Sequence, residues 1–334
     1  MKILVTGGAG FIGRRIVRRL LEHGHEVHVL GRTTRPTDET VSFVAVDLAR
    51  ESMPAGLCKG VDAIFHVAAK AGVWGSASSY SKANVLATRR VVEACHEHGV
   101  RFLIHTSTPS VVFTGQSFRG ESESLPYGRN WLCHYARTKA IAEREVLAAN
   151  GEGGLKTVAL RPHLVWGPED PHLVPKVLER ARSGKLRIVG KGDNRVDLTY
   201  VENAAHAHLL ALDALRSGNH PGGKAYFLAD EEPVSLWPWL NELLGQLGEP
   251  PVTRQISLRK AYAIGFLLEC VWRALGLAGE PPMTRFVAKQ LAEDHWFDVS
   301  AAKRDLGYEP IVSMEDGLRD TASWFKTAKG SRKR

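Results

Sequence analysis

Short apolar runs alternate with stretches of helical periodicity along the first half of the chain. The run at residues 2–6 is followed by apolar residues at helical intervals from Ile12 to Leu21. Further apolar runs stand at residues 27–30 and 41–46. Because the alternation continues to about residue 165, we expect an α/β fold with a doubly wound parallel sheet, covered by helices on both faces.

The first predicted strand leads straight into a glycine-rich turn, TGGAGFIG at residues 6–13, and the first predicted helix follows it. In that position a glycine turn presents backbone N–H groups to a pyrophosphate, whereas elsewhere it would serve only as a tight turn. We expect Gly7 to permit the turn, Gly10 to let the backbone approach the phosphates, and Gly13 to let the helix pack closely on the sheet. The expected site also includes the residues between these glycines, Phe11 and Ile12. The pattern predicts a dinucleotide-binding Rossmann domain.

The end of the second predicted strand indicates which dinucleotide is bound. Enzymes that use NAD usually place an acidic residue there, but this strand ends Leu-Gly-Arg at residues 30–32. Arg32 can pair with a 2′-phosphate, and Arg35 and Arg14 are further candidates. We interpret the cofactor as NADP; the alternative is that these arginines are merely solvated. At the end of the next strand, Asp47 and Leu48 are placed to contact the adenine, although an ordinary turn aspartate would look the same.

A tyrosine and a lysine one helical turn apart form the candidate chemical centre. Tyr135 could exchange a proton with a carbonyl oxygen, and the charge of Lys139 on the same helix face would lower the pKa of the phenol. This spacing is common by chance and gains weight from the dinucleotide turn before it. Thr108 is our first candidate to hold the carbonyl oxygen and Ser107 our second, since both follow a buried strand. Either hydroxyl could instead satisfy the strand-end backbone.

Charge and cysteine content exclude some other classes of protein. The net charge is +8, but lysines and arginines are spread along the chain, so we do not expect nucleic acid as a partner. Only residues 326–334 form a concentrated basic run, which predicts a flexible tail. The four cysteines lack metal-ligand spacing, so we expect a reduced, cytoplasmic protein without a metal. The first strand begins at residue 2, so we expect no signal peptide.

Taken in order, the motifs resemble the extended short-chain dehydrogenase/reductase family. The resemblance continues as far as Asn203 and rests on residues 6–13, 66–69, 84–85, 106–108, 135–139, 160–162, 166–168 and 197–203. It implies a proton donor at Tyr135, its partner at Lys139 and a carbonyl-polarising residue at Thr108. The family also implies a water-mediated proton relay at Asn84. Further cofactor contacts implied in this way are Ala68, Ala69, Pro162, His163 and Val165.

A closer resemblance, within the 3β-hydroxysteroid dehydrogenase-like branch, is to the bacterial 2-alkyl-3-oxoalkanoate reductases of long-chain olefin biosynthesis. It rests on residues 68–76, 106–111, 138–143, 173–175 and 279–286. This resemblance implies NADPH-dependent reduction of the 3-oxo group and assembly with other enzymes of the olefin pathway. Three alternatives stay open: a hydroxysteroid or sterol dehydrogenase, a nucleotide-sugar epimerase, and a non-catalytic NADP sensor. A homodimer also stays open.

The chain length suits two joined domains. We expect an NADP-binding domain at residues 1–168, to which segments within 196–230 return, and a smaller, mostly helical substrate-binding region at 169–330. The apolar segment 258–278 reads as an amphipathic helix that forms core, an alkyl groove, or a contact with a membrane surface or partner.

A β-keto acid substrate would also require a cation for its carboxylate. Four residues near the motifs are eligible, and the sequence does not rank them: Lys70, Arg129, His163 and Arg195.

Overall fold

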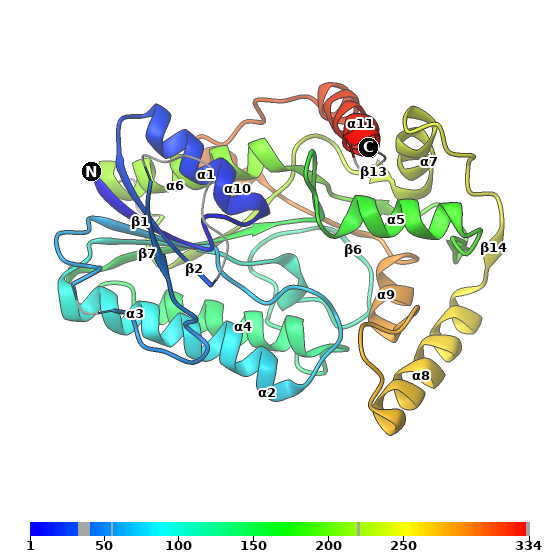
Figure 1. Cartoon of the computed structure of the whole chain (residues 1–334), viewed down its shortest axis with the longest axis horizontal. Helices are drawn as coiled ribbons and strands as arrows, with labels where there is room; N and C mark the ends of the chain where they lie inside the picture. Colours follow the sequence, from blue (N-terminus) through cyan, green and yellow to red (C-terminus); the bar gives the residue numbers. More distant parts are fainter. Residues whose placement is uncertain (33–40, 55, 219–220, 332–334) are drawn as a thin grey trace.

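Seven parallel strands form the main sheet, in the order β12-β7-β5-β4-β1-β2-β3 (Figure 1). The computed structural model describes residues 1–32, 41–54, 56–218 and 221–331. The chain runs outward from β1 to β3, returns to β4 beside β1, and then runs outward to β12. The winding therefore reverses between β1 and β4, which confirms the doubly wound fold. The strands are β1 (Lys2–Thr6), β2 (Glu26–Gly31), β3 (Ser42–Ala45), β4 (Ala63–His66), β5 (Phe102–Thr106), β7 (Lys156–Pro162) and β12 (Lys224–Leu228).

Helices cover both faces of this sheet (Figure 1). Alternate side chains of a strand point to opposite faces, and the strands carry apolar residues at both kinds of position. Ile3 and Val5 of β1 pack in the same cluster as residues of α1 and α6. Leu4, between them, packs in the cluster that contains α3. The helices on the first face are α1 (Phe11–Glu22), α6 (Val201–Ser217) and α10 (Ser300–Leu306), and those on the second are α2 (Ala77–Tyr80), the π-helix η1 (Ser81–Leu86), α3 (Ala87–His98) and α4 (His134–Ala148).

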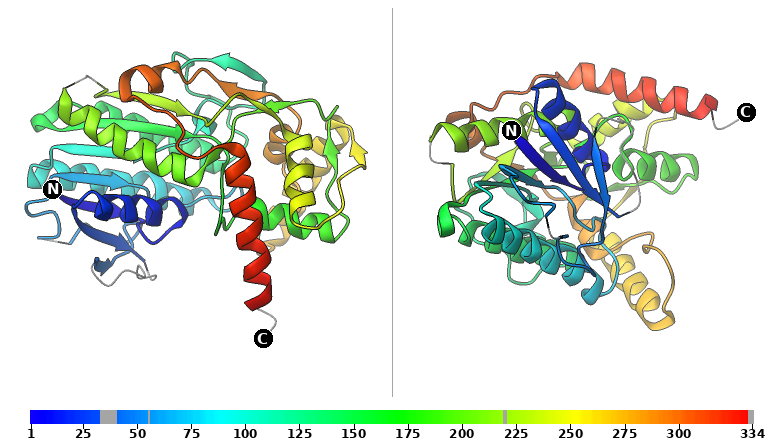
Figure 2. Two further views of the ribbon diagram at one scale, coloured as in Figure 1. Left: turned by 90° about the horizontal axis from the view of Figure 1, so that it is seen from above. Right: turned by 60° about the vertical axis from the view of Figure 1, so that its left-hand side comes forward.

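The C-terminal part of the chain is smaller and mostly helical (Figure 2). A second hydrophobic core lies within it. Trp166, Trp237 and Trp239 are buried there, and the rings of Trp166 and Trp239 meet edge to face at 5.1 Å. The helices of this part are α5 (Leu173–Arg182), α7 (Leu236–Gln246), α8 (Leu258–Leu275), α9 (Arg285–Gln290) and α11 (Met314–Ser331).

Three small sheets join segments that are distant in the sequence. The largest has the order β13-β10-β15-β6, and in it β6 from the first half of the chain pairs with β15 from the last. Its strands are β6 (Phe118–Glu121), β10 (Arg195–Val196), β13 (Val234–Ser235) and β15 (His295–Phe297). The two-stranded sheets pair β8 (Val165–Trp166) with β11 (Thr199–Tyr200), and β9 (Ile188–Val189) with β14 (Gln255–Ile256). Short 3-10 turns stand at η2 (Pro109–Val111) and η3 (Glu152–Gly154).

The C-terminal segments differ from expectation in two places. Residues of α10 and the following Tyr308 are buried in the core of the main sheet, a return that the sequence did not suggest. α11 continues to Ser331, whereas the basic run predicted a flexible tail from residue 326. Apolar contacts of Leu318, Ala322 and Phe325 with the second core hold the earlier turns of this helix.

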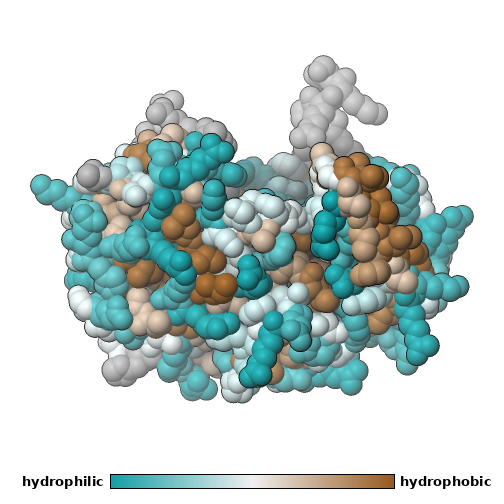
Figure 3. Space-filling view, turned by 90° about the horizontal axis from the view of Figure 1, so that it is seen from below, coloured by the Kyte–Doolittle hydropathy of each residue, from teal (hydrophilic) through white to brown (hydrophobic). Residues whose placement is uncertain are grey.

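α8 projects from the body at the lower right of Figure 1. Only Ala261, Gly265 and Glu269 are buried among its 18 residues. The helix therefore is not a core helix, and over it Figure 3 shows a hydrophobic ridge.

Candidate active site

The glycine turn lies where the winding of the sheet reverses, which is where doubly wound folds bind their ligands. Gly7 has a φ of +70°, and its N–H donates to Leu30 O at 2.7 Å. A side chain at Gly7 would meet the backbone of Ala68 at 2.9 Å. The turn therefore brings β1, β2 and the segment after β4 into close contact, which only glycine allows.

The first turn of α1 is open to an anion. Gly10 is the N-cap, and among the described residues no side chain caps the helix there. A Cβ at Gly13 would lie 2.2 Å from Gly7 O, so Gly13 lets the helix pack on the turn itself. Gly8 makes the close contact with the sheet instead, since its Cβ would meet Val29 at 2.7 Å. A bare, uncapped helix start after a strand fits the pyrophosphate of a dinucleotide, with Phe11 and Ile12 in its first turn.

Arg32 directly follows β2 and is exposed. Val46 N donates to Gly31 O at 2.8 Å, which places Asp47 next to the end of β2. Asp47 accepts a hydrogen bond from Ala49 N and lies 3.7 Å from the guanidinium of Arg50, as a turn aspartate does. The neighbouring Leu48 is buried. Arg35, the second candidate for a phosphate, lies outside the described residues.

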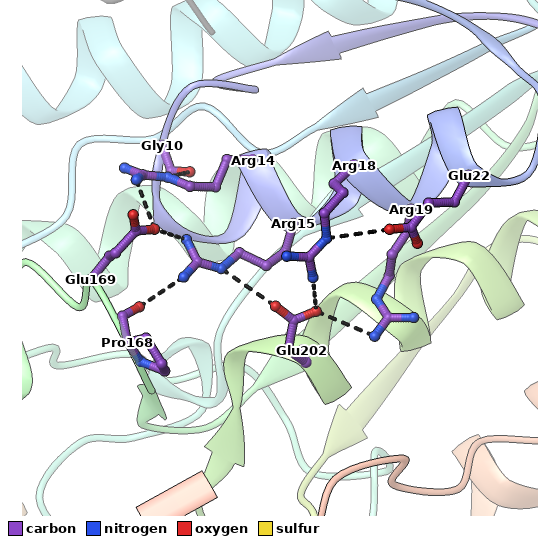
Figure 4. Close-up of polar contacts among 9 residues, drawn as sticks. All are labelled: Gly10, Arg14, Arg15, Arg18, Arg19, Glu22, Pro168, Glu169 and Glu202. Carbon is purple, nitrogen blue, oxygen red and sulfur yellow. Dashed lines mark hydrogen bonds and ion pairs between the residues drawn. The ribbon is translucent and has the colours of Figure 1, made fainter. Parts of the chain in front are cut away.

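Arg14 belongs to a cluster of ion pairs at the start of α1 (Figure 4). Its Nη1 donates to Glu169 at 2.8 Å, and Arg15 donates to the same carboxylate at 2.5 Å. Glu202 of α6 accepts from Arg18 and Arg19. The arginines at the start of α1 are therefore neutralised by carboxylates, and Arg32 is the better placed of the described candidates for a 2′-phosphate.

A groove of about 640 Å³ lies beside this cluster, between α1, α6 and α11. Arg15, Tyr200 and Trp324 are among the residues that line it. Among the described residues its lining includes none of the predicted catalytic group, so this groove is separate from the candidate site.

The segments expected along the cofactor are firmly held. Ala68 N donates to Thr6 Oγ1 at 3.3 Å, and Ala69 after it is exposed. After β7 ends at Pro162, His163 N donates to Thr199 Oγ1 at 3.1 Å. The His163 ring lies 2.6 Å from His295 Nδ1, and burial lowers its pKa well below the ordinary value. A neutral, engaged His163 is thus a positioning group for the bend at residues 164–165, where Leu164 has a φ of +40° and Val165 begins β8.

Tyr135 and Thr108 lie side by side. Thr108 ends the loop after β5, and its hydroxyl is within hydrogen-bonding reach of the Tyr135 phenol. Burial raises the pKa of Tyr135 to about 12, and the Thr108 hydrogen bond opposes this rise only in part. The expected lowering by Lys139 is not seen in this structure. Tyr135 is therefore protonated at neutral pH, as a proton donor to a ketone must be.

Lys139 follows Tyr135 by one turn of α4, is buried, and directs its ammonium at β5. Its ammonium donates to Thr106 O at 2.6 Å and lies 3.1 Å from His105 Nε2. Burial lowers the pKa of Lys139 to about 8, although Glu143 favours the charged form. These two groups hold the ammonium against β5, and its charge does not offset the effect of burial on the pKa of the protonated Tyr135 phenol.

Ser107 faces a different group from Thr108. Its buried hydroxyl lies near the carboxylate of Glu143 but outside hydrogen-bond geometry. That carboxylate accepts from Tyr127 at 2.6 Å and from Arg161 at 2.5 and 3.0 Å. Burial opposes ionisation here, but Arg161 and these hydrogen bonds hold the pKa of Glu143 below its usual range. Sequence reasoning did not assign a role to this buried pair. The one available signal was the spacing, since Glu143 follows Lys139 by one helical turn.

Asn84 lies in the π-helix η1, a distortion that often marks functional sites. It accepts from Lys70 N at 2.7 Å, donates to Lys70 O at 3.2 Å, and donates to Thr138 Oγ1 at 3.1 Å. Asn84 therefore ties the loop after β4 to α4, the helix that carries Tyr135 and Lys139.

The structure separates the four candidates for a substrate carboxylate. Lys70 lies on the loop whose backbone is hydrogen bonded to Asn84. Its ammonium lies 4.8 Å over the Tyr80 ring and donates to Ser79. Arg195 instead donates to Pro233 O, and His163 is paired with His295. Arg129 is exposed in the loop before α4. Of the four, Lys70 is the cation most closely linked to α4, through Asn84.

The sequence model of the 3-beta hydroxysteroid dehydrogenase/isomerase family matches residues 4–258, most of the chain. The protein belongs to this family. It is thus an oxidoreductase of the extended short-chain dehydrogenase/reductase type, as the motifs indicated.

Two relatives and one solved structure show how far the similarity extends. The 2-alkyl-3-oxoalkanoate reductase of Stenotrophomonas maltophilia (strain K279a) is 49% identical over 323 residues, which cover 96% of this chain and 98% of that protein. The decarboxylating sterol-4-alpha-carboxylate 3-dehydrogenase of Mus musculus is 34% identical over 328 residues, covering 97% and 91%. UDP-glucuronic acid 4-epimerase from Bacillus cereus, in complex with NAD, has a TM-score of 0.76 at 24% identity, covering 98% and 99%. This last likeness shows a common fold.

Proposed function

We propose that the protein reduces the 3-oxo group of a long-chain 2-alkyl-3-oxoalkanoate with NADPH, giving a 2-alkyl-3-hydroxyalkanoate for olefin biosynthesis by a β-lactone route. The observation that carries this proposal is the 49% identity with a 2-alkyl-3-oxoalkanoate reductase over nearly the full length of both chains. The side-by-side arrangement of Tyr135 and Thr108, with Lys139 behind them, supports it. We place the enzyme in the cytoplasm, beside other enzymes of that pathway.

In this mechanism Tyr135 donates its proton to the substrate oxygen as negative charge develops there. Thr108 donates a hydrogen bond to the same oxygen, and the buried Lys139 ammonium stabilises the phenolate that forms. When bound, NADPH supplies the hydride to C3, so the ketone and one proton become an alcohol. Asn84, which links Lys70 to α4, keeps the site aligned and extends the proton relay to solvent.

NADP rather than NAD is proposed from the edge of the sheet at β2. The strand ends without a carboxylate, and the exposed Arg32 stands where the adenosine ribose would lie. The uncapped start of α1 supports the pyrophosphate. For the substrate carboxylate we propose Lys70, because its loop is hydrogen bonded to Asn84.

A sterol dehydrogenase is the second candidate, because the mouse sterol-4-alpha-carboxylate 3-dehydrogenase is 34% identical over 97% of this chain. It would use the same catalytic residues on a rigid substrate. The two functions differ in the substrate that turns over.

The test of the substrate is NADP⁺ reduction with a racemic long-chain 2-alkyl-3-hydroxyalkanoate, beside a 3β-hydroxysterol carboxylate and a UDP-sugar. We expect turnover with the hydroxyalkanoate alone, and a loss of about a hundredfold or more in Tyr135→Phe. Tyr226→Phe is the matched control, since its hydroxyl bonds Asp305 on the other edge of the sheet. Turnover of the sterol alone would assign the sterol as the substrate in place of the hydroxyalkanoate. A Tyr135→Phe variant with wild-type activity would overturn the mechanism.

The cofactor is tested with Arg32→Asp. The new carboxylate would repel a 2′-phosphate and accept from a ribose hydroxyl, so we expect kcat/KM to fall with NADPH and rise with NADH. Arg50→Asp, at another exposed arginine of the same edge, serves as the control. An unchanged preference in Arg32→Asp would contradict the assignment of NADP.

A further inference from the structure

The exposed face of α8 is apolar along most of its length. From residue 261 to the end of the helix the exposed positions are all apolar except Cys270 and Arg273. Four large side chains are strongly exposed: Ile264 at 45%, Phe266 at 52%, Leu267 at 62% and Leu275 at 68%. Leu277, just beyond the helix, is 41% exposed. Soluble proteins rarely leave so many apolar groups together in water, so this face has a binding role.

Close packing holds α8 in this position. A Cβ at Gly265 would lie 2.7 Å from the backbone of Thr284, so the two segments approach closely. Glu269 accepts hydrogen bonds from Arg285 N at 2.7 Å and from the Arg285 guanidinium at 2.8 Å. The helix is thus anchored by one face and presents the opposite face outward as a ridge (Figure 3).

The charges around the ridge indicate what covers it. Between residues 250 and 278 the one carboxylate is Glu269, which is 3% exposed and paired with Arg285. The other charged side chains of this stretch are all exposed cations without a carboxylate partner among the described residues: Arg254, Arg259 and Lys260 before or at the start of α8, and Arg273 near its end. A helix with an apolar face and basic flanks is typical of proteins that lie on an anionic lipid surface.

The length and hydropathy of the helix suit lying on a membrane rather than crossing it. Within the described part of the chain, no helix is long and apolar enough to span a bilayer. An interfacial helix buries its apolar face in the headgroup region and keeps its anchored face on the protein.

The ridge is continuous with the candidate site. The guanidinium of Arg273 lies 5.8 Å from the Trp74 ring, and Glu280, just beyond α8, accepts from Val73 N at 3.1 Å. Trp74 and Val73 belong to the loop that carries Ala68, Ala69 and Lys70. The C-terminal end of α8 therefore rests on the loop that borders the site.

We propose that the α8 ridge docks the enzyme on an anionic lipid surface, with Phe266, Leu267 and Leu275 in the headgroup region and Arg259, Lys260 and Arg273 on lipid phosphates. In this position the candidate site faces the lipid surface, from which a long-chain substrate would pass into the site. That last step rests on the proposed function, whereas the docking itself rests on the exposed face of α8.

The thiol of Cys270 offers a direct probe, because it is exposed on α8 while Cys58, Cys95 and Cys133 are buried. An environment-sensitive dye on Cys270 of the full-length protein should shift to the blue with phosphatidylcholine vesicles that contain phosphatidylglycerol. Phosphatidylcholine vesicles alone, or high salt, should give a much smaller shift. Flotation of the unlabelled protein with the same vesicles checks that the dye does not cause binding.

Variants on the ridge decide the assignment. Leu267→Gln should weaken vesicle binding by about tenfold or more, and Lys260→Gln by about fivefold. Ile311→Gln is the matched control, since Ile311 is 48% exposed at another surface, between α10 and α11. Folding of each variant is checked by its thermal midpoint.

Binding that ignores phosphatidylglycerol, or that survives Leu267→Gln, would overturn the proposal. So would a dimer in sedimentation velocity that Leu267→Gln converts to a monomer, because a second copy would then be the occupant. Vesicle binding and sedimentation velocity do not depend on turnover. If the proposed substrate is wrong, these two measurements still test the docking.

Discussion

The fold changes the protonation of Lys139, and measurements of activity and of stability can both detect this change. Burial lowers its pKa to about 8 from 10.5, so the ammonium is lost above pH 8 in the folded protein. Because the phenol of Tyr135 stays protonated to about pH 12, we expect reductive kcat/KM for NADPH to fall as pH rises through about 8. A pH profile that stays flat to pH 10 would contradict this.

The free energy of unfolding should change with pH in the opposite direction to the activity, because of the same lowered pKa of Lys139. Between pH 8 and 10.5 the unfolded chain keeps the Lys139 proton that the folded protein has released. The unfolded state then binds more protons, so the contribution of Lys139 to the free energy of unfolding rises with pH in this window. Urea titrations of the wild type and of Lys139→Met across this window measure the free energy of unfolding. The rise with pH that Lys139 contributes should be present in the wild type and absent in Lys139→Met.

At the level of secondary-structure elements, the buried ion pair of Glu143 and Arg161 joins α4 to β7. Their side chains are 0% and 3% exposed. Glu143→Gln leaves the guanidinium buried without its counter-charge, so we expect a loss of about 3–5 kcal/mol in the free energy of unfolding. Urea unfolding measures this loss.

Glu145 provides the control on the same helix. It pairs with Arg89 at the surface, where the arginine side chain is 54% exposed. Glu145→Gln should therefore change stability by less than about 1 kcal/mol. Equal effects of the two substitutions would show that burial of the Glu143 pair is not what holds α4.

In the molecule as a whole, Arg15 joins three segments that are distant in the sequence. It donates to Glu169 at 2.5 Å and to Pro168 O at 2.9 Å, and lies 3.6 Å from Glu202 of α6 (Figure 4). Its side chain is 8% exposed. Arg15→Met removes these contacts but leaves both carboxylates with other arginines, so we expect a loss of about 1–3 kcal/mol.

Arg18→Met is the comparison for this prediction, because its side chain is 54% exposed and it contacts Glu202 and Glu22 at the surface. We expect a change within about 1 kcal/mol. Urea midpoints of the two variants, with unchanged slopes, give the measurement. An Arg15→Met variant as stable as the wild type would show that the cluster does not hold these segments together.

The sequence by itself determined the type of fold and the family. The strand at residues 2–6, the glycine turn and the helix after it follow from short-range periodicity and from glycines that no other residue can replace. The order of the motifs as far as Asn203 was enough to indicate the extended dehydrogenase/reductase family, which the match over residues 4–258 confirms.

Only the tertiary structure decided which groups meet. The contacts of Glu143 with Tyr127 and Arg161, and of Asn84 with Lys70, join segments that no local pattern connects. The same is true of the protonation of Tyr135 and Lys139, because burial sets both pKa values. The sequence left the apolar segment 258–278 open between core, groove and surface. That choice depends on what the rest of the chain packs against it, and the fold leaves one face of α8 uncovered.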